Sequence, residues 1–103
     1  MKAKPTYQQL MEQIAEAAVE FQQAEILRNA LKRELSVMYA TYFRAHGRPG
    51  NGDRARFDLE DPAYRGVIQF TEGAYSRWFD QRALTTKLKR RLRGLVERLE
   101  RAQ

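Results

Sequence analysis

Apolar residues in the first half of the chain recur at alternating intervals of three and four residues. Eleven of the twelve positions in this repeat are apolar or aromatic, and Arg28 is the exception. A repeat sustained over so many turns is typical of a helix that packs along a coiled-coil-like seam. We call these the core positions of the first repeat: Tyr7, Leu10, Ile14, Ala17, Phe21, Ala24, Arg28, Leu31, Leu35, Met38, Tyr42 and Ala45.

The residues at both ends of this segment are typical helix boundaries. Thr6 and Gln9 have the spacing of a capping box, in which each side chain accepts a hydrogen bond from the other residue's backbone. At the other end, His46 is followed by Gly47, which can adopt the left-handed conformation that ends a helix. Since the segment contains no other Gly and no Pro, the sequence predicts one helix over residues 6–46.

The same spacing returns in the last third of the chain. Asp61 is a favourable N-cap and Pro62 a favourable first helical residue, so we expect a second helix over residues 62–102. Its middle is more polar than the first helix, which leaves open a break within residues 82–86, with Thr85 or Thr86 as a new cap. The core positions of this second repeat are Tyr64, Val67, Thr71, Ala74, Trp78, Gln81, Thr85, Leu88, Leu92, Leu95, Leu99 and Ala102.

A Gly-rich linker, residues 47–61, joins the two repeats, so we expect one all-α domain over residues 1–103, a long antiparallel helical hairpin. Pairing the core positions gives a register in which partner numbers sum to 109, for example Leu10 with Leu99. The strongly polar layer of this register is Arg28 against Gln81. Either the Arg28 stem packs while its head reaches water, or the layer fixes the register at some cost in stability.

Each predicted helix also carries apolar residues away from its core positions. A second apolar stripe of this kind usually needs a further partner. Because homodimers are the commonest oligomers, we expect two hairpins to pack as a four-helix bundle. The residues concerned are Val19, Ile26, Ala30 and Val37 in the first repeat and Ile68, Tyr75, Phe79 and Val96 in the second.

Composition narrows the possible chemistry. The chain has 103 residues, no cysteine and one histidine, which excludes disulfide bonds, thiolate zinc sites and multi-histidine metal centres. No apolar run approaches the roughly 18–20 residues of a membrane span, and no signal peptide is visible. We therefore expect a soluble, cytoplasmic protein with no membrane partner.

Catalytic motifs are also missing. The Gly-rich residues 47–52 lack the Gly-Lys-Ser/Thr of a phosphate-binding loop. Asp58, Glu60 and Asp61 could hold a hard cation such as Mg²⁺, but Asp61 is already explained as a helix cap. We expect no enzymatic activity, no metal and no cofactor.

Charge is the feature that points to a function. The formal net charge is +6, and residues 82–103 carry eight basic side chains against two acidic ones. Glutamates of the first helix, at positions 12, 16, 20 and 25, could neutralise them across the hairpin. Alternatively, the excess is a binding surface for nucleic-acid phosphates, which is the function we predict, or for an acidic protein surface or an anionic membrane, although a membrane-binding helix would need a cleaner apolar face. The predicted phosphate-binding residues are Arg82, Lys87, Lys89, Arg90, Arg91, Arg93, Arg98 and Arg101.

A second functional hypothesis rests on the aromatic residues. Nine of the eleven aromatic residues lie between residues 39 and 79, toward the loop end of the hairpin. Core packing accounts for part of this cluster, and exposed aromatic and Arg side chains are common anchors in protein interfaces. The alternative is therefore a protein–protein interaction module, such as an adaptor, assembly factor or inhibitor. Its candidate contact residues are Arg48, Arg54, Arg56, Tyr75 and Phe79.

Overall fold

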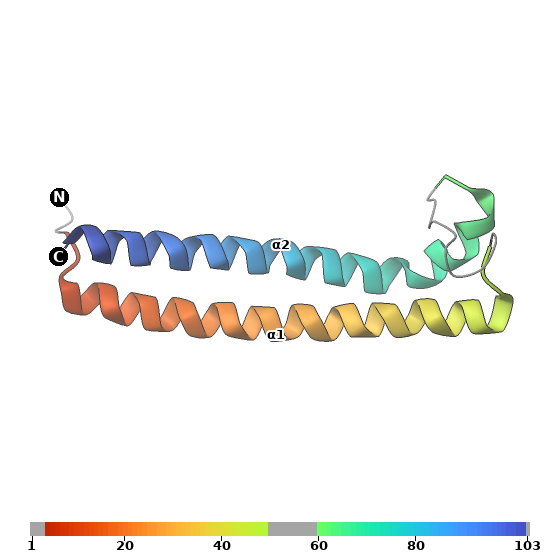
Figure 1. Ribbon diagram of the computed structural model, residues 1–103, viewed down its shortest axis with the longest axis horizontal. Helices are drawn as coiled ribbons and strands as arrows, with labels where there is room; N and C mark the ends of the chain where they lie inside the picture. Colours follow the sequence, from red (N-terminus) through yellow and green to blue (C-terminus); the bar gives the residue numbers. More distant parts are fainter. Residues whose placement is uncertain (1–3, 50–59, 103) are drawn as a thin grey trace. The chain divides into compact units, whose positions relative to one another are not determined.

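The computed structural model describes residues 4–49 and 60–102, and these residues are helical apart from the segment ends. Helix α1 spans Tyr7–His46, a single 3₁₀ turn η2 spans Pro62–Tyr64, and helix α2 spans Arg65–Ala102 (Figure 1). No strand occurs in the described ranges. The all-α prediction and the packing of two long helices against each other are confirmed.

The chain divides into two compact units, each containing part of both helices. The first unit joins residues 1–28 to residues 80–103, and the second unit comprises residues 29–79. Within each unit a segment of α1 packs against a segment of α2 that runs in the opposite direction (Figure 1). Each unit is therefore a two-helix layer with its own small core.

The predicted boundaries of α1 are confirmed by their hydrogen bonds. The Thr6 backbone N–H donates to Gln9 Oε1 at 2.9 Å, and the Gln9 N–H donates back to Thr6 Oγ1 at 3.1 Å. At the C-terminal end Gly47 has a φ of 78°, and its N–H donates to the Phe43 carbonyl at 2.8 Å. These contacts satisfy backbone groups that a helix end leaves without a partner.

The start of the second helical segment is confirmed with one refinement. Asp61 Oδ1 accepts a hydrogen bond from the Ala63 N–H at 2.9 Å, and Pro62 is the first helical residue. The first turn is 3₁₀ rather than α-helical, and the α-helix proper begins at Arg65. The sequence located the cap but not this tighter first turn.

Helix α2 continues through residues 82–86 without the break that the sequence left open. The Thr85 hydroxyl lies 2.7 Å from the Gln81 carbonyl, and the Thr86 hydroxyl lies 3.1 Å from the Arg82 carbonyl. Both hydroxyls therefore bond to the preceding turn of their own helix instead of capping a new one.

The core of the first unit lies at the core positions of both repeats. Its buried residues are Leu10, Ala17, Ala24, Thr85 and Leu95. The Thr85 hydroxyl lies 3.2 Å from the Ala24 carbonyl, and these two positions are partners in the register that sums to 109. The predicted register is confirmed here.

For the polar layer of Arg28 and Gln81 in the first unit, each of the two interpretations left open by the sequence applies in part. Gln81 Nε2 donates to the Ala24 carbonyl across the helix pair at 3.2 Å. Arg28 is partly exposed, and its guanidinium lies 3.7 Å from Glu25 on the same helix. Gln81 thus makes a specific cross-helix bond, while the Arg28 head reaches the surface.

The core of the second unit follows the same pattern. Its buried residues are Leu35, Tyr64, Val67, Thr71 and Ala74. Tyr42, the predicted partner of Val67, packs directly over the neighbouring Gly66, and its ring centroid lies 5.7 Å from that of Phe70. The register is therefore consistent with the prediction in this unit as well.

Most of the second apolar stripe is exposed. On α1 the relative exposures are 57% for Val19, 65% for Ile26 and 63% for Val37. On α2, Tyr75, Phe79 and Val96 are exposed, whereas Ile68 is half-buried. Tyr7 was predicted at a core position but is exposed, because it lies in the first turn of α1 and its predicted partner, Ala102, is a small residue at the end of α2.

Candidate nucleic-acid interface

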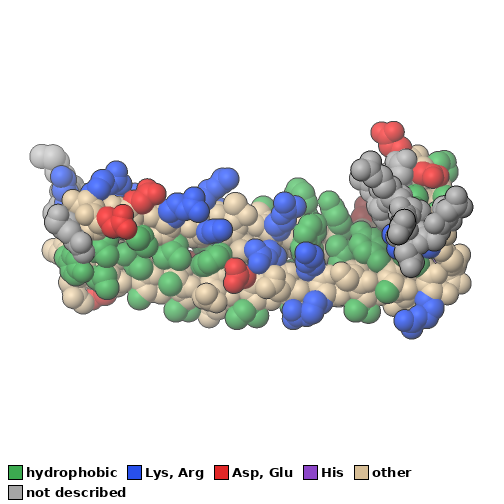
Figure 2. All heavy atoms as spheres, viewed as in Figure 1, with side chains coloured by type: hydrophobic (Ala, Val, Ile, Leu, Met, Phe, Trp, Pro, Cys, Tyr) green, Lys and Arg blue, Asp and Glu red, His purple; other side chains and the backbone are tan. Residues whose placement is uncertain are grey.

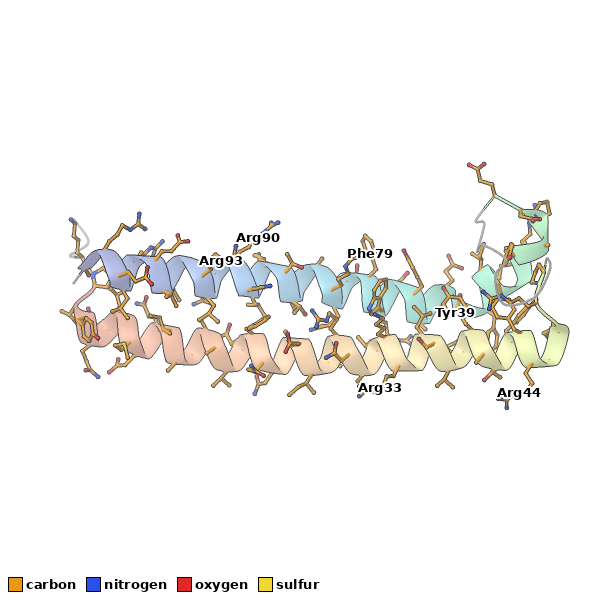
Figure 3. The ribbon with its side chains drawn as sticks, in the orientation of Figure 1. Arg33, Tyr39, Arg44, Phe79, Arg90 and Arg93 are labelled. Atoms are coloured by element: carbon orange, nitrogen blue, oxygen red, sulfur yellow. The ribbon has the colours of Figure 1, made fainter. Side chains whose placement is uncertain are left out.

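The eight predicted phosphate-binding residues all lie on α2 within the first unit, and all are exposed. None occupies a core position, because the core positions of this segment hold Gln81, Thr85 and four leucines. Lys and Arg side chains gather over this part of α2 in Figure 2. The labelled Arg90 and Arg93 project away from α1 (Figure 3).

Ion pairing involves few of these cations. Arg91 Nη1 lies 3.3 Å from Glu20 Oε2 on α1. Six others have no carboxylate of the described residues within ion-pair distance. We call these six the basic surface: Lys87, Lys89, Arg90, Arg93, Arg98 and Arg101.

The geometry of the helix pair explains why the glutamates of α1 leave this surface charged. Side chains meet across an antiparallel pair only when they flank the core positions. Glu20 and Arg91 flank them in the first unit, as Glu34 and Arg77 do in the second unit at 2.9 Å. Glu12 and Glu16 lie on the opposite side of α1 and form no ion pair with a described residue. Ion pairs between the two helices therefore neutralise the charge of Arg91 but leave the charges of the basic surface.

The sequence analysis included Glu20 among four glutamates that could neutralise the basic segment, but it did not single out the Glu20–Arg91 pair and did not anticipate Glu34–Arg77. In both, the partner numbers sum to 111, two more than the sum for core partners. A search for opposite charges at flanking positions of the register would have found Glu20–Arg91 and Glu34–Arg77.

The aromatic candidates lie in the second unit. Tyr75 is 45% exposed and Phe79 51% exposed, and their rings stack with centroids 6.1 Å apart. Trp78 lies next to them, 5.7 Å from Tyr75 between ring centroids. Tyr75 and Phe79 are thus brought together as an exposed apolar patch, and the labelled Phe79 projects away from α1 (Figure 3).

The arginine candidates do not extend this patch. The Arg48 guanidinium lies over the ring of Phe43, 5.4 Å from its centroid, in a cation–π arrangement at the end of α1. Arg54 and Arg56 lie outside the described residues.

Only part of the acidic cluster considered as a cation site, Asp58, Glu60 and Asp61, lies within the described residues. Asp58 lies outside the described residues, and Asp61 is engaged as the cap of η2. No three His, Asp or Glu side chains within residues 4–49 and 60–102 are grouped so that they could hold a metal ion. Neither described helix contains a stretch long and apolar enough to cross a membrane.

Comparisons with known proteins add no family to these observations. The chain matches no family model, no curated protein and no solved structure among those with which it was compared.

Proposed function

We propose that this protein binds nucleic acid without catalysing a reaction, and that it does so through the basic surface of α2. The observation that carries the proposal is the set of six exposed cations with no described carboxylate within ion-pair distance, although Glu97 and Glu100 lie on the same segment of α2. Like charges at neighbouring helix positions repel one another, and a polyanion relieves that repulsion. Binding to phosphates also releases condensed counterions, which supplies most of the affinity of sequence-independent complexes.

The residue types suit phosphate contacts better than base recognition. Four of the six residues are arginines, whose planar guanidinium can bind two phosphate oxygens at once. The cations are spread along and around the exposed side of α2. This distribution matches the repeated charges of a phosphate backbone better than the edge of a single base. We therefore expect binding with little sequence preference.

The test measures binding of a mixed-sequence duplex by fluorescence anisotropy over a series of salt concentrations. Six phosphate contacts predict a log–log slope of about −5 for affinity against salt. Changing Lys87, Arg90 and Arg93 to Gln should bring the slope to about −3, since each lost contact removes about 0.9. Arg91 is left unchanged because it pairs with Glu20.

A matched control separates a defined surface from general charge attraction. Changing Lys32, Arg44 and Arg65 to Gln removes the same number of exposed cations from other parts of the chain. This control should keep the salt slope of the unchanged chain. Equal losses in the two variants would show that net charge alone drives binding, and the assignment to α2 would be wrong.

The exposed stacking of Tyr75 and Phe79 favours a second candidate function, binding of another protein. Such an interface would be anchored by aromatic side chains and would depend little on salt. This alternative would be supported if the chain does not bind the duplex but binds another protein, and if changing Phe79 to Ser abolishes the binding of that protein.

Self-association is a further part of the proposal. The exposed apolar side chains on both helices favour a homodimer in which two hairpins contribute four helices to one assembly. The main support for this proposal comes from Val19, Ile26 and Val37, since each of these side chains is more than half exposed.

A further inference from the structure

Helix α1 begins and helix α2 ends at the same end of the first unit (Figure 1). A hollow of about 440 Å³ lies where these two helix ends meet. Part of its lining is apolar, because Pro5, Leu10 and Ala102 contribute to it. Leu10 is 3% exposed and belongs to the core of the unit, so the apolar part of the hollow is anchored in packed structure.

Three cations also line the hollow, and no described acidic residue does. Lys4 lies just before α1, and Arg98 and Arg101 lie about one turn apart on α2. All three are exposed, and none has a carboxylate of the described residues within ion-pair distance. Glu97 and Glu100 lie on the same turns of α2 but do not line the hollow. The hollow therefore brings three positive charges together at one concave place.

Arg98 and Arg101 are also the last members of a row of positions along one side of α2. The row starts at Lys87 and passes Arg91 and Gly94, with spacings that alternate between four and three. Residues with these spacings share one face of a helix. Gly94 leaves the middle of the row open, since no neighbouring atom lies within 4 Å of the place that its Cβ would take. A phosphate backbone that follows this row reaches the hollow at the end of α2.

We propose that the hollow binds the phosphate monoester at the end of a nucleic-acid strand. This inference rests on the nucleic-acid binding proposed above, and it adds which part of the ligand the chain recognises. A terminal monoester carries a charge of about −1.5 to −2 at pH 7, which is more than the single charge of a phosphate within the strand. It also has three free oxygen atoms that can accept charge-assisted hydrogen bonds from three cations.

The shape of the site favours a terminal phosphate over one within a strand. On the exposed side of α2 the surface is convex, so the cations there contact a phosphate from one side. In the hollow, cations from two separate chain segments reach the ligand, and the apolar wall of Pro5 and Leu10 displaces part of its water. A phosphate within a strand has a nucleotide on each side, so fewer of its oxygens can face three cations at once.

The test compares one short mixed-sequence duplex prepared with 5′-phosphates, with 3′-phosphates, or with hydroxyls at every end. Each unlabelled form competes with the same internally labelled duplex in fluorescence anisotropy. The unchanged chain should bind at least one phosphorylated form about tenfold more tightly than the hydroxyl form, since hydrogen bonds to charged groups are strong enough for such a factor. The two phosphorylated forms show which end of a strand the hollow accepts.

Two matched variants separate the hollow from the rest of the basic surface. Lys4→Gln with Arg101→Gln removes two cations from the hollow, and Lys87→Gln with Arg90→Gln removes two cations outside it. The first variant should lose the preference for the phosphorylated end while still binding the hydroxyl form. The second should bind all forms more weakly and keep the preference. All four residues are exposed, so helicity should be unchanged in both variants, which circular dichroism checks.

The failure of this inference is distinguishable from the failure of the proposed function. Equal binding of all three duplexes with a steep salt dependence would overturn the inference and leave nucleic-acid binding intact. A preference that survives the change of Lys4 and Arg101, or that is lost equally in both variants, would also overturn the assignment to the hollow. No binding of any duplex would contradict the proposed function itself, and the inference with it.

Discussion

Gly66 shows how closely α1 and α2 approach each other in the second unit. A Cβ atom at this position would collide with the hydroxyl and ring of Tyr42. Gly94, also within α2, has no neighbouring atom within 4 Å of the same point. Two glycines that look alike in the sequence therefore have different roles, and only the packing distinguishes them.

Replacing these glycines by alanine should have effects of opposite sign. Gly66→Ala should lower the free energy of unfolding by about 1–2 kcal/mol, because overpacking outweighs the gain of about 1 kcal/mol in helix propensity. Gly94→Ala should raise it by about 0.5–1 kcal/mol. Urea denaturation followed by circular dichroism measures both. Stabilisation by Gly66→Ala would show that Tyr42 does not lie against Gly66 in solution.

At the scale of the helices, local signals set where each one begins and ends. Thr6 with Gln9 begins α1, Gly47 ends it, and Asp61 precedes η2, all as the residue types predicted. Capping depends on bonds within three residues of the helix end, so the sequence contains the needed information. The sequence left open whether α2 continues through Thr85, and it did not predict the 3₁₀ geometry of η2. Both features depend on the opposing helix or neighbouring turns.

The cap at Asp61 provides a test at this scale. Asp61→Ala removes the acceptor of the Ala63 N–H and should destabilise the protein by about 1 kcal/mol. Asp61→Asn keeps a side-chain oxygen at the same place and should lose only a fraction of that. Thermal or urea unfolding compares the two variants. If Asn costs as much as Ala, the carboxylate charge rather than the hydrogen bond is the important feature.

Across the whole molecule, charge is distributed more unevenly than the two interhelical ion pairs can balance. Glu20–Arg91 and Glu34–Arg77 each join exposed side chains, and exposed pairs of this kind contribute at most about 1 kcal/mol. The basic surface concentrates the excess positive charge on one segment of α2. Repulsion within that segment should reduce the stability of the free chain at low ionic strength.

The unfolding temperature should therefore rise with salt in the absence of nucleic acid. Between 20 and 200 mM NaCl we expect an increase of about 4 °C, which corresponds to roughly 1 kcal/mol for a chain of this size. Changing Lys87, Arg90 and Arg93 to Gln should flatten this dependence, and the Lys32, Arg44 and Arg65 control should not. Differential scanning calorimetry gives the comparison. An unfolding temperature that falls with salt would mean that attractive ion pairs dominate the free chain.

The sequence by itself determined the two helices, their capped ends and the register that pairs Ala24 with Thr85. It could do so because heptad spacing and capping are short-range patterns, and because a one-residue slip would expose the apolar core positions. It also placed the excess positive charge on residues 82–103 and the exposed apolar stripe on α1.

Only the tertiary structure decided which of these charges are neutralised and which close contacts exist. Of Glu12, Glu16 and Glu20, only Glu20 flanks the core positions, so the register allows its pair with Arg91, and the packing of the two helices forms it. The bond from Gln81 to the Ala24 carbonyl and the contact of Tyr42 with Gly66 had no such signal in the sequence. The physical reason is the same in each case: the outcome depends on which sides of two helices face each other within a few ångströms, and residue spacing along one helix does not contain that distance.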